Sequence, residues 1–325
     1  MRTFVLLRVA AALSVLAVAG CSGGEHAPGD PGLADAVTSS TSAPDATSGA
    51  NGTRCATAGP ATTVVYRRIA GIDANLTSLD VHAPAGACNA PVVVWVHGGG
   101  YRIGDKANQI SDKIRLFNDQ GWILVSINYR LTRPGQPGSA QFPDHFDDTA
   151  AAIAWVRAEI GKYGGDASRL ALLGHSAGAD IVANVATNPR YLAVYGVGLD
   201  ALRCAGPLDT EGFDKQRAGA NDPDGEQEQW KVSLGNNTAY LSETSATGLI
   251  RAGIGIPPMI GVVRGTARRR EIETTFLATL RATGIAATTI EAGSLTHEQV
   301  NSRIGAAGDT VMTPPLMAFL RTCLR

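Results

Sequence analysis

A five-residue motif, G-H-S-A-G at residues 174–178, restricts the folds open to this chain more than any other stretch of its sequence. An apolar run typical of a short buried strand precedes it at residues 170–173, and an apolar stretch that favours a helix follows at residues 179–186. A turn this tight between a strand and a helix admits only small neighbours beside its central residue, which explains the two glycines. The pattern predicts that the Ser176 hydroxyl stands clear of the backbone, and that the amide of Ala177 lies at the start of a helix.

A second glycine-rich stretch also follows an apolar run. Residues 91–96 are typical of a strand, and H-G-G-G-Y follows at residues 97–101. Because successive glycines have no Cβ, they let backbone amides turn inward. Inward amides stabilise the negative charge that develops on a carbonyl oxygen during acyl transfer. The predicted oxyanion donors are the amides of Gly99, Gly100 and, across the site, Ala177.

These two motifs, in this order, resemble those of α/β-hydrolase esterases of the hormone-sensitive-lipase and carboxylesterase type. Shorter stretches add to the resemblance: Y-R-L at residues 129–131, F-P at 142–143, A-W-V-R at 154–157 and G-G-D at 164–166. The similarity covers about residues 62–325 and implies an α/β fold, with helices on both faces of a mostly parallel central sheet and a small cap insertion. It further implies a serine hydrolase that cleaves carboxylic esters of small to medium acyl chains through an acyl-enzyme, with no cofactor.

The rest of the chain alternates short apolar runs with helical stretches. Residues 64–68 and 76–82 are expected to form an opening antiparallel pair. Further strands are expected at residues 92–96, 123–127, 170–173, 202–206, 259–263 and 287–291, and helices at 147–160, 179–187, 271–282 and 315–324. This alternation predicts a mostly parallel sheet whose active site lies beyond the carboxyl ends of the strands. Both glycine motifs fall at such ends.

One segment breaks this alternation. Residues 211–252 are polar and rich in turn-forming residues, as in N-D-P-D-G at residues 221–225. The resemblance implies a small cap or lid here, between the sixth and seventh strands of the sheet. Trp230 and Tyr240 either line a pocket for the acyl or alcohol group, or pack the cap onto the sheet, and the sequence leaves both interpretations open.

The first 54 residues are expected to lie outside the folded domain. Residues 1–20 carry an early positive charge, are mostly apolar and end in small residues, as a signal peptide does. The ending V-A-G-C at residues 18–21 resembles a bacterial lipobox, which predicts a lipid-modified Cys21, with ordinary secretory cleavage as the alternative. Residues 21–54 comprise this cysteine and a stretch with too few large apolar side chains to fold, which predicts a flexible tether. The hydrolase domain, residues 55–325, is then an exported cell-envelope lipoprotein, anchored to the outer side of the membrane.

The cysteine count agrees with export. The chain has five cysteines, and lipidation of Cys21 leaves an even number in an oxidising compartment. We favour the pairs Cys55–Cys88 and Cys204–Cys323, with four free buried thiols as the alternative. The absence of a C-x-x-C or paired His/Cys spacing gives no reason to expect a metal site, and the net charge of -1 gives none to expect a nucleic-acid partner. The expected partners are a small-molecule ester and, through the lipid, the membrane.

The candidate base follows from the order of residues along the chain. A serine hydroxyl needs a base to take its proton, and α/β-hydrolases place that histidine after the serine and the acid. The chain has six histidines, and only His297 follows Ser176. It lies in G-S-L-T-H-E at residues 293–298, a loop after the last expected strand, where the family places its base. His97 and His175 belong to the glycine motifs and are expected to serve as framework.

The acid that should orient this histidine departs from the family pattern. The family usually carries an aspartate just past the seventh strand, in a stretch like H-G-x-x-D, but here Arg264 occupies the place of the histidine and Arg268 that of the aspartate. Glu271 follows the arginines and has a longer reach, so we take it as the tentative acid. Asp209, which ends the sixth expected strand, is the alternative acid. Weaker candidates are Glu273 and Glu291.

Other functions stay open, because the motifs do not report which bond is cleaved and because the usual acid is missing. Related folds cleave amides, formamides or acylated polysaccharides with the same machinery, and a chain without its acid could be a catalytically impaired surface binding lipoprotein. The arginines at positions 264, 268, 269 and 270 have two interpretations as well. They form either a solvated helix start with salt bridges to nearby acids, or a basic rim that favours anionic substrates or lipid head groups.

Overall fold

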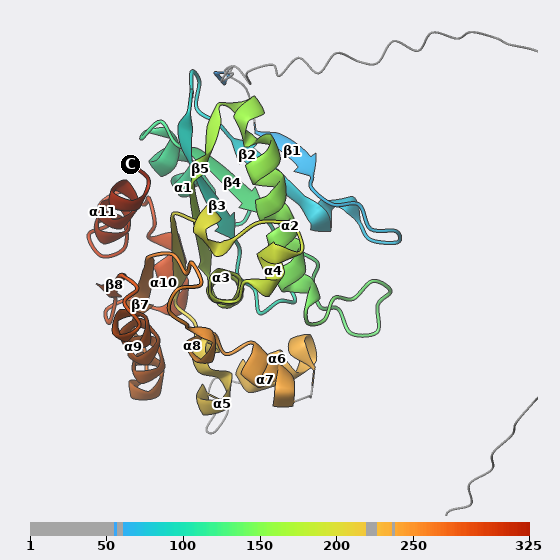
Figure 1. Ribbon diagram of the computed structural model, residues 1–325, viewed down its shortest axis with the longest axis vertical. Coiled ribbons are helices and arrows are strands. Elements are labelled where there is room, and N and C mark those ends of the chain that lie inside the picture. Colours follow the sequence, from blue (N-terminus) through green and yellow to red (C-terminus); the bar gives the residue numbers. More distant parts are fainter. Residues whose placement is uncertain (1–54, 57–60, 219–225, 236–237) are drawn as a thin grey trace, which may run out of the picture. The chain divides into compact units, whose positions relative to one another are not determined.

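The structure is a computed structural model that describes residues 55–56, 61–218, 226–235 and 238–325 (Figure 1). All of these belong to one compact unit, Asn51–Arg325. The signal peptide, the lipidated Cys21 and the tether expected from the sequence lie outside the described residues. Within the described part of the chain, none of the helices combines the length and the apolar character that a membrane span requires.

A single mixed sheet carries both glycine motifs at the ends of its central strands. Eight strands of the described chain form it, in the order β1-β2-β4-β3-β5-β6-β7-β8. They are β1 (Thr62–Val65), β2 (Ser78–His82), β3 (Ala90–Val96), β4 (Ile123–Ile127), β5 (Gly165–His175), β6 (Cys204–Leu208), β7 (Met259–Val263) and β8 (Ala287–Glu291). β2 is antiparallel to both β1 and β4, and all the other neighbours are parallel. The carboxyl ends of the parallel strands therefore share one edge of the sheet, where ligands bind in such folds.

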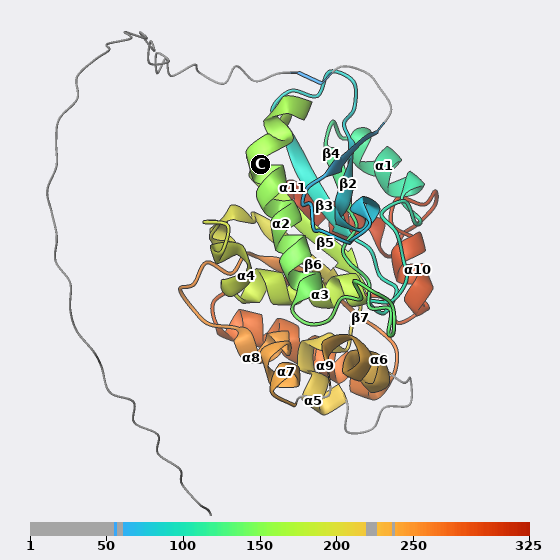
Figure 2. The ribbon, with the colours of Figure 1, turned by 90° about the vertical axis from the view of Figure 1, so that its right-hand side faces the viewer.

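Helices cover both faces of this sheet (Figure 1 and Figure 2). One face packs against α2 (Asp144–Glu159), α3 (Ala177–Thr187) and α9 (Ala267–Ala282), and the other against α1 (Ser111–Asn118), α10 (His297–Ser302) and α11 (Thr313–Cys323). Side chains along β3 point alternately into the two cores, with Val94 in one and Val93 and Trp95 in the other. A strand that is apolar on both sides has to be covered on both sides, so the sequence of β3 requires this layered arrangement. The remaining short elements are α4 (Arg190–Ala193), η1 (Ala74–Thr77), η2 (Ile160–Tyr163) and η3 (Leu199–Ala201).

The expected α/β class is confirmed, and the bounds of several strands and helices are longer, shorter or shifted by a few residues. β4, β7 and β8 have the expected bounds, whereas β5 is longer at both ends. α9 begins at Ala267, one turn before the expected start at Glu271. The Thr266 hydroxyl explains this, because it caps the helix by accepting a hydrogen bond from the Arg269 amide. Glu271 therefore lies in the second turn of the helix rather than at its start.

The segment expected as a cap joins β6 to β7 and contains short helices in its described part. They are η4 (Gly212–Asp214), α5 (Lys215–Ala218), α6 (Glu226–Leu234), α7 (Thr238–Glu243) and α8 (Ala246–Leu249). A buried ion pair ties this segment to the rest of the domain, since Lys215 Nζ lies 2.7 Å from Asp180 Oδ1 on α3. The Tyr240 ring packs against Phe142, with centroids 4.9 Å apart, so this aromatic residue holds the segment against the domain.

Two disulfide bonds join the cysteine pairs expected from the sequence. Cys55–Cys88 ties the start of the described chain to the loop before β3. Cys204–Cys323 joins the first residue of β6 to the end of α11, across a sequence separation of 119 residues. A cross-link over so long a segment restricts the unfolded chain, and on the chain-entropy account this stabilises the fold by about 2–5 kcal/mol.

Candidate active site

β5 ends in the tight turn that holds Ser176. This residue has φ 59° and ψ −123°, a backbone conformation that non-glycine residues rarely adopt, and α3 begins at the next residue. A side chain at Gly174 would place its Cβ 2.5 Å from the carbonyl oxygen of Gly178. One at Gly178 would collide with the carbonyl oxygen of Val96 at the end of β3. Both glycines of the motif are therefore required for the turn and α3 to pack against the sheet.

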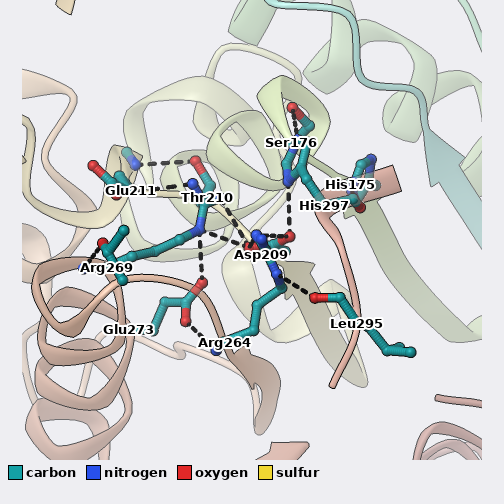
Figure 3. A network of polar contacts seen from close by, with 12 residues as sticks. His175, Ser176, Asp209, Thr210, Glu211, Arg264, Arg269, Glu273, Leu295 and His297 are labelled. Atoms are coloured by element: carbon teal, nitrogen blue, oxygen red, sulfur yellow. Dashed lines mark hydrogen bonds and ion pairs between the residues drawn. The ribbon is translucent and has the colours of Figure 1, made fainter. Parts of the chain in front are cut away.

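Three side chains from separate parts of the chain form one line of hydrogen bonds (Figure 3). His297 Nε2 lies 2.8 Å from Ser176 Oγ, and His297 Nδ1 lies 2.7 Å from Asp209 Oδ2. His297 opens α10, whose start is held by a capping box between Thr296 and Gln299. The Asp209 side chain is fully buried, whereas the His297 side chain is 33% exposed. This arrangement can move a proton from the serine to the imidazole while the carboxylate orients the ring.

The register of two neighbouring strands brings the serine and the carboxylate together. In the pairing of β5 with β6, His175 lies opposite Leu208, so Ser176 and Asp209 each follow a paired position directly. The Ser176 amide also lies 3.3 Å from the Leu208 carbonyl oxygen, to which it donates. Asp209 has φ 67°, a left-handed conformation that aspartate adopts more readily than most residues. The sheet itself therefore places both groups at the same edge.

The structure corrects our choice of acid. Glu271, the residue that we favoured, is exposed and pairs with Arg217 of the cap segment. Asp209, the alternative, contacts His297. Glu271 lies in the second turn of α9, at the surface, where Arg217 is its partner. The signal in the sequence that identifies Asp209 is its place directly after the strand beside the one that carries the serine.

Three of the arginines that follow β7 turn inward and pair with acids. Arg264 Nη1 donates to both carboxylate oxygens of Asp209, at 3.1 and 2.9 Å, and Arg269 Nε donates to Oδ1 at 2.8 Å. Arg268 pairs with Glu211 at 2.7 Å. The side chains of these arginines are only 13%, 7% and 19% exposed, respectively. The salt-bridge interpretation is therefore correct for these three, but they are largely buried rather than solvated and form no basic rim.

The charges around Asp209 keep its carboxylate ionised. Burial alone would raise the pKa of Asp209, but the hydrogen bond from His297 and the positive charges of Arg269 and Arg264 hold that pKa well below its ordinary value. An ionised carboxylate can accept a hydrogen bond from the imidazole Nδ1–H and stabilise the imidazolium that forms when the ring takes a second proton.

A second buried carboxylate, Glu273 on α9, lies beside this group of charges. Its Oε2 accepts a hydrogen bond from the Arg264 amide at 2.8 Å, and its Oε1 lies 3.4 Å from Arg269 Nε. Burial and the negative charge of Asp209 together raise the pKa of Glu273 to about 9, despite these contacts. Glu273 therefore holds its proton at neutral pH and adds no second negative charge beside Asp209.

His97 and His175, which were expected to serve as framework, are both buried near the serine. Burial lowers the pKa of His97 to about 4 and that of His175 to about 3, so both rings are neutral at neutral pH. His175 Nε2 lies 2.9 Å from the His297 carbonyl oxygen, which ties the motif to the histidine loop. The Tyr129 hydroxyl donates to the His97 carbonyl at 3.0 Å and so holds the first residue of the glycine loop.

The H-G-G-G loop lies against the serine. Gly99 has φ 111° and Gly100 has φ 58°, and a Cβ at Gly98 would come within 3.0 Å of the Ser176 Cβ. Such close approach of the backbone requires glycine. The amides that we predicted as oxyanion donors belong to residues that line the cavities adjoining Ser176. Their role as donors stays a prediction.

Two cavities meet at Ser176. The larger has a volume of about 800 Å³ and is lined by His297 and the glycine loop. Polar side chains also line it, among them Arg102, Asn108, Arg133, Gln136 and Asn301. The smaller has a volume of about 30 Å³ and lies among Gly100, Tyr101, Ala177 and Trp230. Both interpretations of Trp230 agree with its position, because it lines this cavity and is also buried in the hydrophobic core that packs on the sheet.

Within the described residues, one group of side chains has the spacing of metal ligands. It consists of His175, Asp209 and His297, whose ligand atoms lie within 4.8 Å of one another. Both ring nitrogens of His297 already contact Ser176 and Asp209, and His175 Nε2 contacts the carbonyl of His297. A metal would have to break these hydrogen bonds, so this set of donors fits proton transfer better than metal binding.

Comparisons with known proteins point to esterases. A family model described as BD-FAE matches residues 79–193. The probable carboxylic ester hydrolase LipM of Mycobacterium tuberculosis is 38% identical over 100 residues, which cover 31% of this chain and 22% of that protein. Esterase LipC of the same organism is 36% identical over 114 residues, which cover 34% of this chain and 27% of that protein. Para-nitrobenzyl esterase of Bacillus subtilis is 34% identical over 107 residues, covering 31% and 22%. The matched segments thus span between 22% and 27% of the length of these relatives.

Solved structures of esterases match over most of their length. The thermophilic esterase Est2 of Thermogutta terrifontis gives a TM-score of 0.63 at 21% identity, covering 81% of this chain and 91% of that one. EstE1, a thermostable carboxylesterase cloned from a metagenomic library, gives a TM-score of 0.62 at 20% identity, and the match covers 76% of this chain and 85% of that one. At this identity the likeness establishes the fold alone. The expected α/β-hydrolase fold and the resemblance to esterases are confirmed.

Replacing Glu273 by glutamine is expected to raise the stability of the protein relative to the wild type, and the difference is expected to grow as the pH rises. The unfolded chain ionises this carboxyl near its ordinary value of 4.5, whereas the folded chain holds the proton up to about 9. The wild type therefore loses stability as the pH rises through this window, and glutamine, which does not ionise, avoids the loss. Thermal unfolding at about pH 5 and about pH 8 should show a Tm difference, Glu273→Gln minus wild type, that grows with pH.

Glu271→Gln is the matched control, because its carboxylate is exposed and pairs only at the surface. A Tm difference for Glu273→Gln that is the same at both pH values would contradict the assignment of a protonated Glu273.

Proposed function

We propose that this chain is a serine hydrolase that cleaves carboxylic esters of small acyl groups through an acyl-enzyme. The observation that carries the proposal is the unbroken line of hydrogen bonds from Ser176 through His297 to Asp209, with distances of 2.8 and 2.7 Å. The names of the relatives and structural neighbours, several of which are esterases, support it. Because these relatives extend well beyond the matched segments, the proposal rests mainly on the geometry of the site.

The first half of the reaction transfers the acyl group to the enzyme. Ser176 Oγ attacks the ester carbon while His297 Nε2 takes the hydroxyl proton. Asp209 stays ionised and stabilises the imidazolium through Nδ1–H. The amides of Gly99, Gly100 and Ala177 donate to the oxyanion of the tetrahedral intermediate. The imidazolium then gives its proton to the leaving oxygen, the ester bond breaks, and the alcohol departs from the acyl-enzyme.

The second half returns the serine to its starting state. A water molecule loses a proton to His297 Nε2 and attacks the acyl carbon, again with the oxyanion held by the same amides. The imidazolium protonates Ser176 Oγ as the acyl bond breaks. The carboxylic acid leaves, and the enzyme is neither oxidised nor reduced.

The positions of the two cavities indicate where each half of the substrate lies. His297 lines the large cavity of about 800 Å³, and its Nε2 has to reach the leaving oxygen, so the alcohol occupies that side. The acyl group then points into the small cavity of about 30 Å³ beside Trp230. That volume suits an acetyl-sized group, which narrows the small to medium acyl chains expected from the sequence.

An acylated polysaccharide or oligosaccharide is a second candidate substrate for the same machinery. The observation that favours it is the polar lining of the large cavity, where Asn108, Gln136 and Asn301 could hydrogen-bond a hydroxyl-rich alcohol. An acetylated oligosaccharide compared with a simple alkyl acetate separates the two substrate classes. A higher kcat/KM for the oligosaccharide favours the second candidate, and a higher value for the alkyl acetate excludes it.

We also propose that the protein is exported and anchored through a lipid on Cys21, as the sequence of residues 1–21 indicates. The two disulfides support an oxidising compartment. In cells, Cys21→Ser is expected to abolish incorporation of labelled fatty acid and to move the protein from the membrane fraction to the soluble fraction. Unchanged labelling and fractionation in Cys21→Ser would contradict lipidation at this residue.

The assignment of the acid is testable with three single variants. Ser176→Ala is expected to abolish ester hydrolysis, and Asp209→Asn to lower kcat by roughly 10³–10⁴-fold, because the imidazolium loses its carboxylate. Glu271→Gln is expected to retain wild-type activity, since its side chain lies at the surface with Arg217. The rates are measured on a nitrophenyl ester. A large loss in Glu271→Gln, together with a small one in Asp209→Asn, would overturn the assignment.

The size of the acyl pocket is testable with a series of nitrophenyl esters from acetate to octanoate. We expect kcat/KM to be highest for acetate and to fall with chain length, because the small cavity that Trp230 lines has a volume of only about 30 Å³. Trp230→Ala is expected to move the optimum toward longer chains. Tyr240→Ala is the matched control, since Tyr240 packs on Phe142 and does not line the small cavity among the described residues. An octanoate optimum in the wild type would contradict this placement of the acyl group.

A further inference from the structure

The two oxygens of the Asp209 carboxylate have different partners (Figure 3). Oδ2 faces the histidine, with His297 Nδ1 at 2.7 Å, and also accepts from Arg264 Nη1 at 2.9 Å. Oδ1 faces the arginines, with Arg269 Nε at 2.8 Å and Arg264 Nη1 at 3.1 Å. Arg264 thus contacts both oxygens, and it fixes how the carboxylate plane is turned toward the imidazole.

Arg264 also holds the loop that carries the histidine. Its Nε donates to the Leu295 carbonyl at 3.1 Å, two residues before His297. Its own position is fixed in turn, because it directly follows β7 and its amide donates to Glu273 Oε2 at 2.8 Å. One guanidinium therefore bridges the acid and the backbone of the histidine loop, and the distance between these two parts of the triad depends on it.

The charge of Arg264 matters as well as its shape. The Asp209 side chain is fully buried, and a buried carboxylate without positive partners takes up a proton. A protonated carboxyl would stabilise an imidazolium far less than an ionised one does. While His297 is neutral, between proton transfers, the positive charges that contact Asp209 within the described part of the chain are those of Arg264 and Arg269.

Other titratable groups face this carboxylate or its arginines and define its surroundings. They are His175 at the end of β5, Glu211 after β6, Arg269 and Glu273 on α9, and His297 on α10. Two of them add little charge at neutral pH, because burial keeps His175 neutral and Glu273 protonated. Glu211 is paired with Arg268 at 2.7 Å and lies farther, at 3.8 Å, from Arg269 Nη1. The balance at Asp209 is therefore set mainly by the two arginines that touch it.

We propose that Arg264 is a positioning residue of the triad, which keeps Asp209 ionised and holds the His297 loop at a fixed distance from it. This inference rests on the proposed hydrolase function and assigns to the arginine a role that the motifs in the sequence do not indicate. Arg264 is not among the described residues that line either cavity, so its effect reaches the substrate through Asp209 and His297.

The test compares three variants with the wild type on a nitrophenyl ester. Arg264→Met removes the charge and the fork of donors, and Arg264→Lys keeps the charge but cannot bridge Asp209 and Leu295 at once. Arg268→Met is the matched control, because its side chain is similarly buried, 19% exposed against 13%, and pairs with Glu211 instead of Asp209. Thermal unfolding and circular dichroism establish that each variant is folded.

Three results are expected for Arg264→Met. Its kcat falls by roughly 10- to 100-fold while KM changes little, because the misplaced groups act on the chemical step rather than on binding. When the pH is lowered, the variant loses its activity at a higher pH than the wild type does, because its Asp209 takes up a proton more readily. Guanidinium chloride at millimolar, non-denaturing concentration restores part of the activity by occupying the vacated site. Arg264→Lys keeps the wild-type pH dependence with a reduced kcat, and Arg268→Met resembles the wild type.

The outcomes separate the proposal from its premise. If the wild type hydrolyses no ester, the proposed function itself is wrong, and the inference about Arg264 falls with it. If the wild type is active and Arg264→Met keeps its kcat and its pH profile, the positioning role is excluded. The same holds if Arg264→Met and Arg268→Met lose activity equally, with no shift in pH dependence and no response to guanidinium, since that pattern indicates a purely structural role. If Arg264→Met does not fold, a wild-type kcat in Arg264→Lys overturns the proposal and a reduced one supports it.

Discussion

The buried negative charge of Asp209 has to be balanced by positive charges within the protein, and the arrangement of the side chains around the site depends on this balance. Arg264 and Arg269 supply the balance from the segment after β7, which is where related esterases are expected to carry their acid. Glu273 keeps its proton beside them, because burial and Asp209 both oppose its ionisation. The carboxylate that faces His297 thus remains ionised without exposure to water. Such a group can stabilise an imidazolium at the moment one forms.

The sheet supplies the geometry that this charge arrangement needs. Ser176 and Asp209 each follow a paired position on neighbouring strands, so the distance between them is set by strand register rather than by a mobile loop. Both residues directly follow their strands and have positive φ. The histidine arrives separately, at the start of a capped helix, and the Arg264 guanidinium links its loop to the carboxylate. Fixed positions of this kind lower the cost of reaching the transition state.

Local patterns predicted the parts of this molecule that local interactions determine. The strands, the serine turn and the glycine loop follow from apolar runs and from places where only glycine fits. Glu271 lies at the surface with Arg217, whereas Asp209 contacts His297, and both of these pairings join residues that are far apart in the sequence. The inward turn of Arg264 and Arg269 depends on acids that are distant in sequence and adjacent only after folding. Propensity and spacing along one chain carry no information on such pairs.

The most direct test of this account is to trap the covalent intermediate. The purified domain is mixed with nitrophenyl acetate, quenched in acid within the first turnover, digested and analysed by mass spectrometry. The account predicts an acetyl group on the peptide that contains Ser176, absent from Ser176→Ala, and accumulating in step with the first release of nitrophenol. Hydrolysis that persists in Ser176→Ala, or an acetyl group that forms only on another residue, would contradict it.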